Sequence, residues 1–138
     1  MIKEIWKNTL PSFGAQIRVE REKFFHHAIY VDDKTVIQFG DGFSYFKNPE
    51  VNTVCVTCLK DFLSGGVLEV RKYDDEELKK LKTSELIVKT ALQHLGERGY
   101  DFLFNNCEHF SNDCAFGIRY SSQTDEIRER VIKLMNKK

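Results

Sequence analysis

The sequence predicts an α+β protein in which an antiparallel β-sheet, built from the first half of the chain, packs against helices built from the second half. Short runs of alternating apolar and polar residues, separated by turn residues, occupy residues 17–72. Apolar residues at helical spacing follow from residue 83 onward. A length of 138 residues with 41% hydrophobic content is sufficient for one core. We therefore expect a single domain over residues 1–138.

The first strands are predicted between residues 17 and 39. Residues 17–20 alternate apolar with charged side chains. Residues 24–31 are rich in aromatic and β-branched types and end in the turn signal Asp32-Asp33-Lys34, after which residues 35–39 return. This pattern predicts a β-hairpin.

The two adjacent histidines of this hairpin are predicted to lie on opposite faces. His26 shares a face with Tyr30, whereas His27 lies on the more apolar face, which we expect to look into the core. A three-residue loop would place Gln38 opposite Ala28 and diagonally beside His26, while a two-residue loop would pair Gln38 with His27. We favour the three-residue loop because it brings Gln38 to His26.

The middle of the chain is predicted to extend the sheet. Residues 51–58 and 67–72 alternate as two further strands, joined by a short turn over residues 59–63 and a glycine loop. Three aromatic side chains precede them and form either a short core strand or a loop that enters an interface: Phe43, Tyr45 and Phe46.

Helical signals occupy the last third. The run 74–82 is acidic first and basic last, as in a solvated helix or a linker. Thr83 or Ser84 can cap a helix that Gly96 ends. Apolar spacing over residues 125–138 predicts an amphipathic helix that closes the core, with a membrane-surface helix as the alternative.

Another helix is predicted to begin at Cys107, with Asn106 as its N-cap, because apolar residues recur at helical spacing from there. The positive end of the helix dipole and free backbone amides would lower the pKa of the Cys107 thiol and supply oxyanion donors. We therefore expect Cys107 to be the nucleophile, His26 the base and Gln38 the group that orients the imidazole. His109 lies about 200° around the helix from Cys107, so we assign it a structural hydrogen bond.

These residues carry a family resemblance. The segment Asn106-Cys107-Glu108-His109-Phe110, the strand His26-His27-Ala28-Ile29-Tyr30-Val31 and the step to Gln38 resemble the lecithin-retinol acyltransferase-like family, which includes the small phospholipase A/acyltransferases. The resemblance runs from about Pro11 to Ile127. It implies a circularly permuted papain-like fold, related to bacterial cell-wall cysteine peptidases, and an enzyme that carries acyl groups as a thioester without a cofactor.

The sequence departs from the family pattern at two positions. The family often has His where Gln38 stands; a glutamine can accept a hydrogen bond from an imidazole N–H, but it cannot hold a charge. The family usually has Trp or Tyr where His27 stands, which favours a core-filling role for His27. The predicted substrates are phospholipids or related esters. The alternatives are a cysteine amidase or peptidase and a non-catalytic interaction module like those of some viral proteins.

The charge and the cysteine content of the chain limit the partners that we expect. Lys plus Arg equals Asp plus Glu at 21 each, which gives no electrostatic reason to expect nucleic acid. No apolar run is long enough for a transmembrane anchor, and residues 1–10 do not resemble a signal peptide. Four cysteines then suggest reduced thiols in the cytoplasm, and Cys55-x-x-Cys58 lacks a second ligand pair, so we expect no metal site.

The candidate substrate-binding side chains are aromatic and follow or share a face with the predicted base. Without an anchor or a net positive charge, membrane contact would be weak, peripheral and mediated by inserted aromatic groups. The residues predicted to bind substrate are Tyr30, Phe43, Tyr45 and Phe46.

Overall fold

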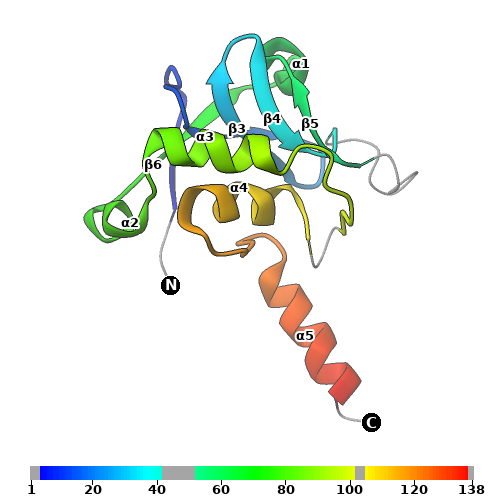
Figure 1. The fold of residues 1–138 in the computed structure, drawn as a ribbon. Helices are drawn as coiled ribbons and strands as arrows, with labels where there is room; N and C mark the ends of the chain where they lie inside the picture. Colours follow the sequence, from blue (N-terminus) through cyan, green and yellow to red (C-terminus); the bar gives the residue numbers. More distant parts are fainter. Residues whose placement is uncertain (1–3, 42–51, 102–104, 137–138) are drawn as a thin grey trace.

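The computed structural model describes residues 4–41, 52–101 and 105–136, and its described part is an α+β fold, as predicted (Figure 1). One six-stranded antiparallel sheet has the strand order β1-β6-β2-β3-β4-β5. Its strands are β1 (Ile5–Lys7), β2 (Gln16–Glu20), β3 (Phe25–Asp32), β4 (Thr35–Phe39), β5 (Val54–Thr57) and β6 (Leu68–Lys72). The helices are α1 (Leu59–Leu63), α2 (Asp75–Lys80), α3 (Ser84–Gln93), α4 (Cys107–Phe116) and α5 (Asp125–Asn136). The alternation pattern of the sequence does not predict β1, which pairs with β6 at one edge.

The β3–β4 hairpin has the predicted register but not the predicted loop. Ala28 pairs with Gln38, as expected from a three-residue loop. The pairing shifts between Tyr30 and Asp32, so that Asp32 pairs with Thr35 across a shorter turn. A β-bulge adds one residue to β3, and this extra residue compensates for the residue that the loop lacks. The face assignments of β3 are therefore the predicted ones.

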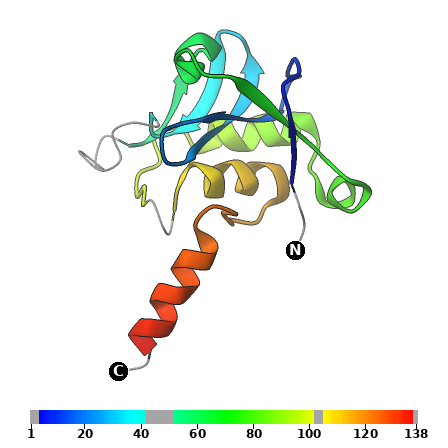
Figure 2. The ribbon, with the colours of Figure 1, turned by 180° about the vertical axis from the view of Figure 1, so that it is seen from behind.

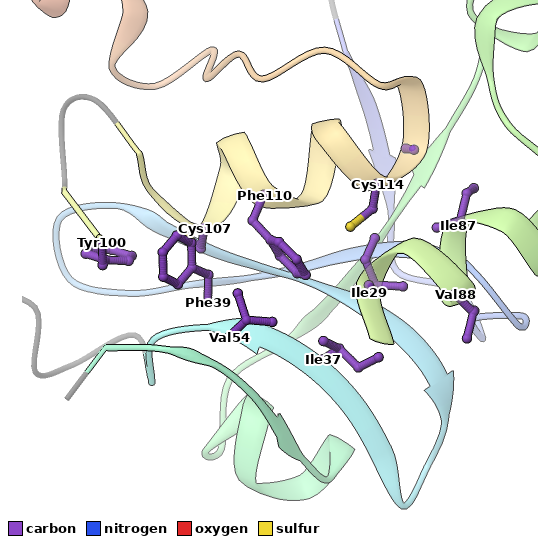
Figure 3. Close-up of a cluster of buried hydrophobic side chains, with 12 residues drawn as sticks. Ile29, Ile37, Phe39, Val54, Ile87, Val88, Tyr100, Cys107, Phe110 and Cys114 are labelled. Carbon is purple, nitrogen blue, oxygen red and sulfur yellow. The ribbon is translucent and has the colours of Figure 1, made fainter. Parts of the chain in front are cut away.

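Each face of the sheet carries its own apolar core. On one face, side chains from β3, β4 and β5 meet those of α3 and α4 (Figure 3). On the other face, β2, β3, β4 and β6 contribute a second cluster that includes Phe62. Residues 59–63 were expected to be only a connecting turn, but they form α1, which delivers the buried Phe62 to this second core.

Local capping explains where several helices begin. Asp74 and Glu77 form a capping box at α2, which makes the charged run a helix rather than a linker. Thr83 accepts a hydrogen bond from the Leu86 N–H at 3.2 Å and starts α3. None of the helices in the described ranges is both long and apolar enough to cross a bilayer.

The prediction that the last helix closes the core is wrong. Helix α5 forms, but Ile127 is 48% exposed and Leu134 and Met135 are each 67% exposed. Figures 1 and 2 show α5 extending away from the rest of the molecule. The outer side of α4 is instead covered by the segment 119–124, which binds it through polar groups. Every residue of α4 except Asp113 and Phe116 is buried, so little of this helix is left for α5 to cover.

Candidate active site

Cys107 is the first residue of α4, and Asn106 caps the helix as predicted. The Asn106 Oδ1 accepts hydrogen bonds from the N–H groups of Glu108 at 2.9 Å and His109 at 3.1 Å. Asn106 itself is buried, and its own N–H is bound by the His109 side chain at 3.0 Å. This reciprocal pattern is a capping box, which fixes the start of α4 and hence the position of Cys107.

The Cys107 thiol lies against the backbone of β3 on both sides of His26. Its Sγ accepts a hydrogen bond from the His27 N–H at 3.5 Å. The thiol also donates to the Phe25 carbonyl oxygen, at a distance of 3.9 Å. Counted from the hairpin turn, the last residue pair between β3 and β4 is Ala28 with Gln38, one residue short of His27. The thiol therefore occupies the place where β4 no longer pairs with β3.

His26 is held by Gln38. The distance between His26 Nε2 and Gln38 Oε1 is 2.9 Å, and the ring packs against Phe62 with centroids 5.0 Å apart. Because a carboxamide oxygen can only accept, His26 Nε2 carries the proton in this arrangement. His26 Nδ1 is buried and has no hydrogen-bond partner among the described residues. The structure thus leaves a lone pair on Nδ1, the atom that could take a proton from a thiol.

The prediction of a lowered thiol pKa is wrong. Burial raises the pKa of Cys107 to about 12, and the negative charge of Glu108 adds to this effect, although hydrogen bonds from backbone N–H groups oppose it. Burial also lowers the pKa of His26 to about 4, against a smaller opposing effect of the Gln38 hydrogen bond. Desolvation outweighs the helix dipole because the thiol is only 1% exposed. At neutral pH the thiol and imidazole are both uncharged.

His27 lies on the α4 side of the sheet, as strand alternation predicts. It is 1% exposed and contacts Trp6 edge-on, with ring centroids 5.4 Å apart. Its Nε2 lies 4.0 Å from the Glu108 carboxylate and makes no hydrogen bond within the described part of the chain. Burial lowers the pKa of His27 to about 4, although Glu108 opposes the shift.

Glu108 is a buried carboxylate whose place beside the site was not predicted from the sequence. It accepts hydrogen bonds from Ser121 Oγ at 2.7 Å, Ser122 Oγ at 2.5 Å and the Gln123 N–H at 3.1 Å. Burial raises the pKa of Glu108, but the His27 ring and these donors outweigh it, so the net shift is downward. In the sequence, an acidic residue in a first helical turn indicates only a favourable dipole interaction.

Gln123 joins this carboxylate to the start of β3. Its Oε1 accepts from the Phe25 N–H at 2.7 Å, and its Nε2 donates to the Phe25 carbonyl at 3.3 Å and to Glu108 at 3.3 Å. The Gln123 side chain thus bonds both backbone groups of Phe25, as a neighbouring strand would. The Phe25 carbonyl also faces the Cys107 thiol. No local sequence pattern predicts this contact, because the partners are 98 residues apart.

His109 has the structural role that its helical phase predicted. Its Nδ1 accepts from the Asn106 N–H at 3.0 Å, and its Nε2 lies 3.1 Å from Asp125 Oδ1. Since the N–H groups of Glu108 and His109 are bound by Asn106, the first-turn amide left for an oxyanion is that of Cys107. The expected set of oxyanion donors is correspondingly smaller.

The family model described as "Lecithin retinol acyltransferase" matches residues 9–120, a range that contains His26, Gln38 and Cys107. The chain belongs to the lecithin retinol acyltransferase family. The match begins before β2 and ends after α4, so it covers the strands and the helix that position the candidate site.

Known members of the lecithin retinol acyltransferase family are similar over most of this chain. Lecithin retinol acyltransferase of Rattus norvegicus is 27% identical over 138 positions, which cover 86% of this chain and 60% of the relative. Phospholipase A and acyltransferase 1 of Homo sapiens is 29% identical over 125 positions, 83% of this chain and 73% of the relative. Phospholipase A and acyltransferase 5 of Rattus norvegicus is 29% identical over 128 positions, which cover 87% of this chain and 44% of the relative. The chain therefore spans about three-fifths of the length of the rat lecithin retinol acyltransferase.

The predicted substrate-binding residues remain predictions. Tyr30 shares the His26 face of β3, but its hydroxyl donates a hydrogen bond to Asp33 at 2.6 Å in the hairpin turn. The structure therefore brings Tyr30 to the turn rather than to the thiol. The other three predicted residues lie outside the described residues: Phe43, Tyr45 and Phe46.

Proposed function

We propose that this protein is a cysteine acyltransferase or phospholipase A-type enzyme that acts on phospholipid or related ester substrates through an acyl-thioester on Cys107. The proposal is supported by family membership and by the names of its relatives. The observation that carries it is the arrangement around β3. Gln38 holds the His26 ring, whose Nδ1 has no partner among the residues that the structure describes, and the Cys107 thiol lies against the backbone that flanks His26.

In the proposed acylation step, Cys107 Sγ attacks the ester carbonyl carbon while its proton passes to His26 Nδ1. The Gln38 oxygen keeps the opposite ring nitrogen protonated, so the imidazolium that forms carries one proton on each nitrogen. A positioned base of this kind typically contributes ~10²-fold or more. The Cys107 N–H faces the developing oxyanion, and such a donor typically contributes ~3 kcal/mol.

The intermediate then collapses to the acyl-enzyme. The C–O bond to the leaving alcohol breaks, the alcohol oxygen takes the proton from His26, and the acyl group stays on Cys107 as a thioester. Water or an acceptor amine next attacks the thioester, with His26 removing its proton and returning a proton to Cys107 Sγ. Hydrolysis gives phospholipase activity, and attack by an amine gives acyl transfer.

The nucleophile starts as a neutral thiol in this mechanism. Because the pKa of Cys107 is raised and that of His26 is lowered, a resting thiolate–imidazolium pair is disfavoured at neutral pH. Both side chains are 1% exposed, so the site must open before a lipid carbonyl can reach the sulfur. We propose that opening occurs at a lipid surface through weak peripheral contact, with Tyr30, Phe43, Tyr45 and Phe46 as substrate-binding residues.

The same proposal extends to the whole chain. Residues 1–138 form one domain of circularly permuted papain-like topology with its nucleophile at the start of α4, acting in the cytoplasm without a cofactor. The sheet between α1 on one face and α3 and α4 on the other is compatible with this topology.

Intact-protein mass spectrometry after incubation with a short-chain phosphatidylcholine tests the proposed function. We expect one added acyl mass, which disappears in Cys107→Ala and persists in Cys114→Ala. Cys114 is a matched control because it lies on the same helix and is also buried. An adduct that survives in Cys107→Ala would overturn the mechanism. An adduct formed only from peptide or amide donors would indicate an amidase or peptidase, and no adduct from any activated ester would indicate a non-catalytic module.

A further inference from the structure

We propose that Cys55 is a positioning residue that fixes the orientation of the Gln38 carboxamide and, through it, the tautomer of His26. This inference rests on the proposed function, because the tautomer matters only if His26 accepts the Cys107 proton. Cys55 does not touch the reacting atoms. It acts on the hydrogen bond between Gln38 and His26, and these two residues separate it from Cys107.

The contact is built into the sheet. Gln38 of β4 and Cys55 of β5 are directly paired across the two strands, so their side chains share a face. The Gln38 Nε2 donates to Cys55 Sγ at 3.7 Å, while Gln38 Oε1 lies 2.9 Å from His26 Nε2. Gln38 is only 7% exposed, so little water is available to replace this acceptor. Burial raises the pKa of Cys55, which keeps the thiol neutral.

A glutamine at this position needs an orienting partner. The oxygen and the NH₂ group of its carboxamide are nearly the same size, so rotation by 180° exchanges an acceptor for a donor at the same place. With NH₂ facing His26, Nε2 would have to accept, and the ring proton would move to Nδ1. His26 could not then take a proton from Cys107. An acceptor on the far side of Gln38 disfavours this rotated state.

The geometry around Cys55 provides such an acceptor. A neutral thiol is both a weak acceptor and a weak donor, so a rotated amide would exchange its N–H···S hydrogen bond for an S–H···O hydrogen bond that forms only when the Cys55 S–H turns toward Gln38. A neutral hydrogen bond of ordinary strength contributes ~1 kcal/mol, so this weaker bond favours one of two otherwise similar orientations at most about five-fold. The productive orientation then holds about five sixths of the molecules in place of about one half. We therefore expect a small effect of Cys55 on turnover and no effect on substrate binding.

The kinetic test compares Cys55→Ala with Cys58→Ala in the full chain, using hydrolysis of a short-chain phosphatidylcholine. Cys58 is a matched control because it is also a free cysteine, and its side chain makes no capping hydrogen bond at α1. We expect kcat to fall about 1.7-fold in Cys55→Ala, because losing a preference of ~1 kcal/mol lowers the productive orientation from about five sixths of the molecules to about one half, with KM unchanged. Cys55→Ser should recover part of the loss because its hydroxyl can accept. Equal kcat in Cys55→Ala and wild type would overturn the proposal.

A double-mutant comparison separates orientation from packing. In Gln38→Glu, both side-chain oxygens accept, so rotation no longer changes what His26 meets. Adding Cys55→Ala to Gln38→Glu should therefore leave kcat unchanged. The same fall in kcat in this background as in the Gln38 background would show that Cys55 acts through packing and would overturn the positioning role.

The His26 tautomer provides a readout that does not depend on activity. Nitrogen-15 NMR of the imidazole should show Nε2–H as the dominant form in wild type and a mixture of the two neutral forms in Cys55→Ala. The same tautomer ratio in both proteins would overturn the proposal. If the ratio changes but wild type forms no thioester on Cys107, the positioning role stands and the proposed function fails.

Discussion

His26 and His27 are neighbours in the chain, equally buried and equally shifted in pKa, yet their surroundings differ completely. Each is 1% exposed, and burial lowers each pKa to about 4. His26 faces a neutral carboxamide, and its other ring nitrogen meets no hydrogen-bonding group in the described ranges. His27 faces an aromatic ring and a carboxylate that several other donors already bind. The comparison teaches that a perturbed pKa does not distinguish the proposed base from its neighbour, whereas the partner of each ring nitrogen does.

The largest expected difference between the two histidines is in catalysis. His26→Ala should lower kcat/KM ~10²-fold or more, because the proton acceptor for Cys107 is lost. His27→Phe should change it only a few-fold, since His27 contributes an edge contact to Trp6 and a backbone N–H that the variant keeps. Steady-state kinetics measure kcat/KM of the two variants, and circular dichroism checks that each is folded. A greater loss in His27→Phe than in His26→Ala would reverse the assignment.

Acid stability is the next effect in size, and here His27 should matter. The folded protein holds His27 neutral, whereas the unfolded chain protonates it at an ordinary pKa. Wild type therefore loses stability as pH falls from about 6.5 to about 4, by roughly 3 kcal/mol for this one group. His27→Phe removes that loss, so its free energy of unfolding should depend less steeply on pH in this range.

Urea denaturation of wild type and His27→Phe at about pH 7 and at about pH 4 would check the acid effect. The difference between the two proteins should shift in favour of the variant at the lower pH. Parallel pH dependence in the two proteins would mean that His27 is not held neutral in the folded state.

Glu108 should matter for stability before it matters for catalysis. In Glu108→Gln, charge-assisted hydrogen bonds from Ser121 and Ser122 become neutral ones, and an amide NH₂ meets groups that are themselves donors. We expect the free energy of unfolding to fall by ~2 kcal/mol, the scale of a hydrogen bond to a charged group. Glu76→Gln on α2 is a control, since that side chain is 73% exposed. An equal change in both variants would mean that the Glu108 carboxylate contributes nothing specific.

The smallest expected effect is that of Gln38→His. An imidazole can also accept from His26 Nε2–H, so activity should stay within about three-fold of wild type, less than the loss of an ordinary hydrogen bond. The pH–rate profile would show whether the acidic limb moves. Gln38→Leu has no acceptor and is the contrasting variant. Full activity in Gln38→Leu would show that His26 needs no partner at Nε2.

The features predicted correctly from sequence depend on local rules. The α4 start follows from the Asn106 cap and apolar spacing, and the two faces of β3 follow from alternation. Even an incorrect loop length left the Ala28–Gln38 pair in place, because the bulge restored the register. Hydrogen bonds between residues close in sequence, such as that of His109 with Asn106, were within reach of the same reasoning.

The failures concern properties that depend on distant segments. Amphipathic spacing shows which side of α5 could be buried, but not that another segment already covers α4. The helix dipole acts locally on Cys107, whereas its desolvation comes from packing against β3. The partners of Glu108 also come from beyond the end of its own helix. Each of these errors has the same physical origin, which is tertiary burial.

The buried, protonated Cys107 has a consequence for the chemical resistance of this protein. Peroxide and simple alkylating agents react with thiolates that they can reach, and Cys107 in this closed state is neither ionised nor accessible. General electrophiles and mild oxidants should therefore reach and modify the half-buried Cys58 before Cys107. A covalent inhibitor of Cys107 would need to open the site, as we propose that a lipid does, and its selectivity would come from that step rather than from the reactivity of its warhead.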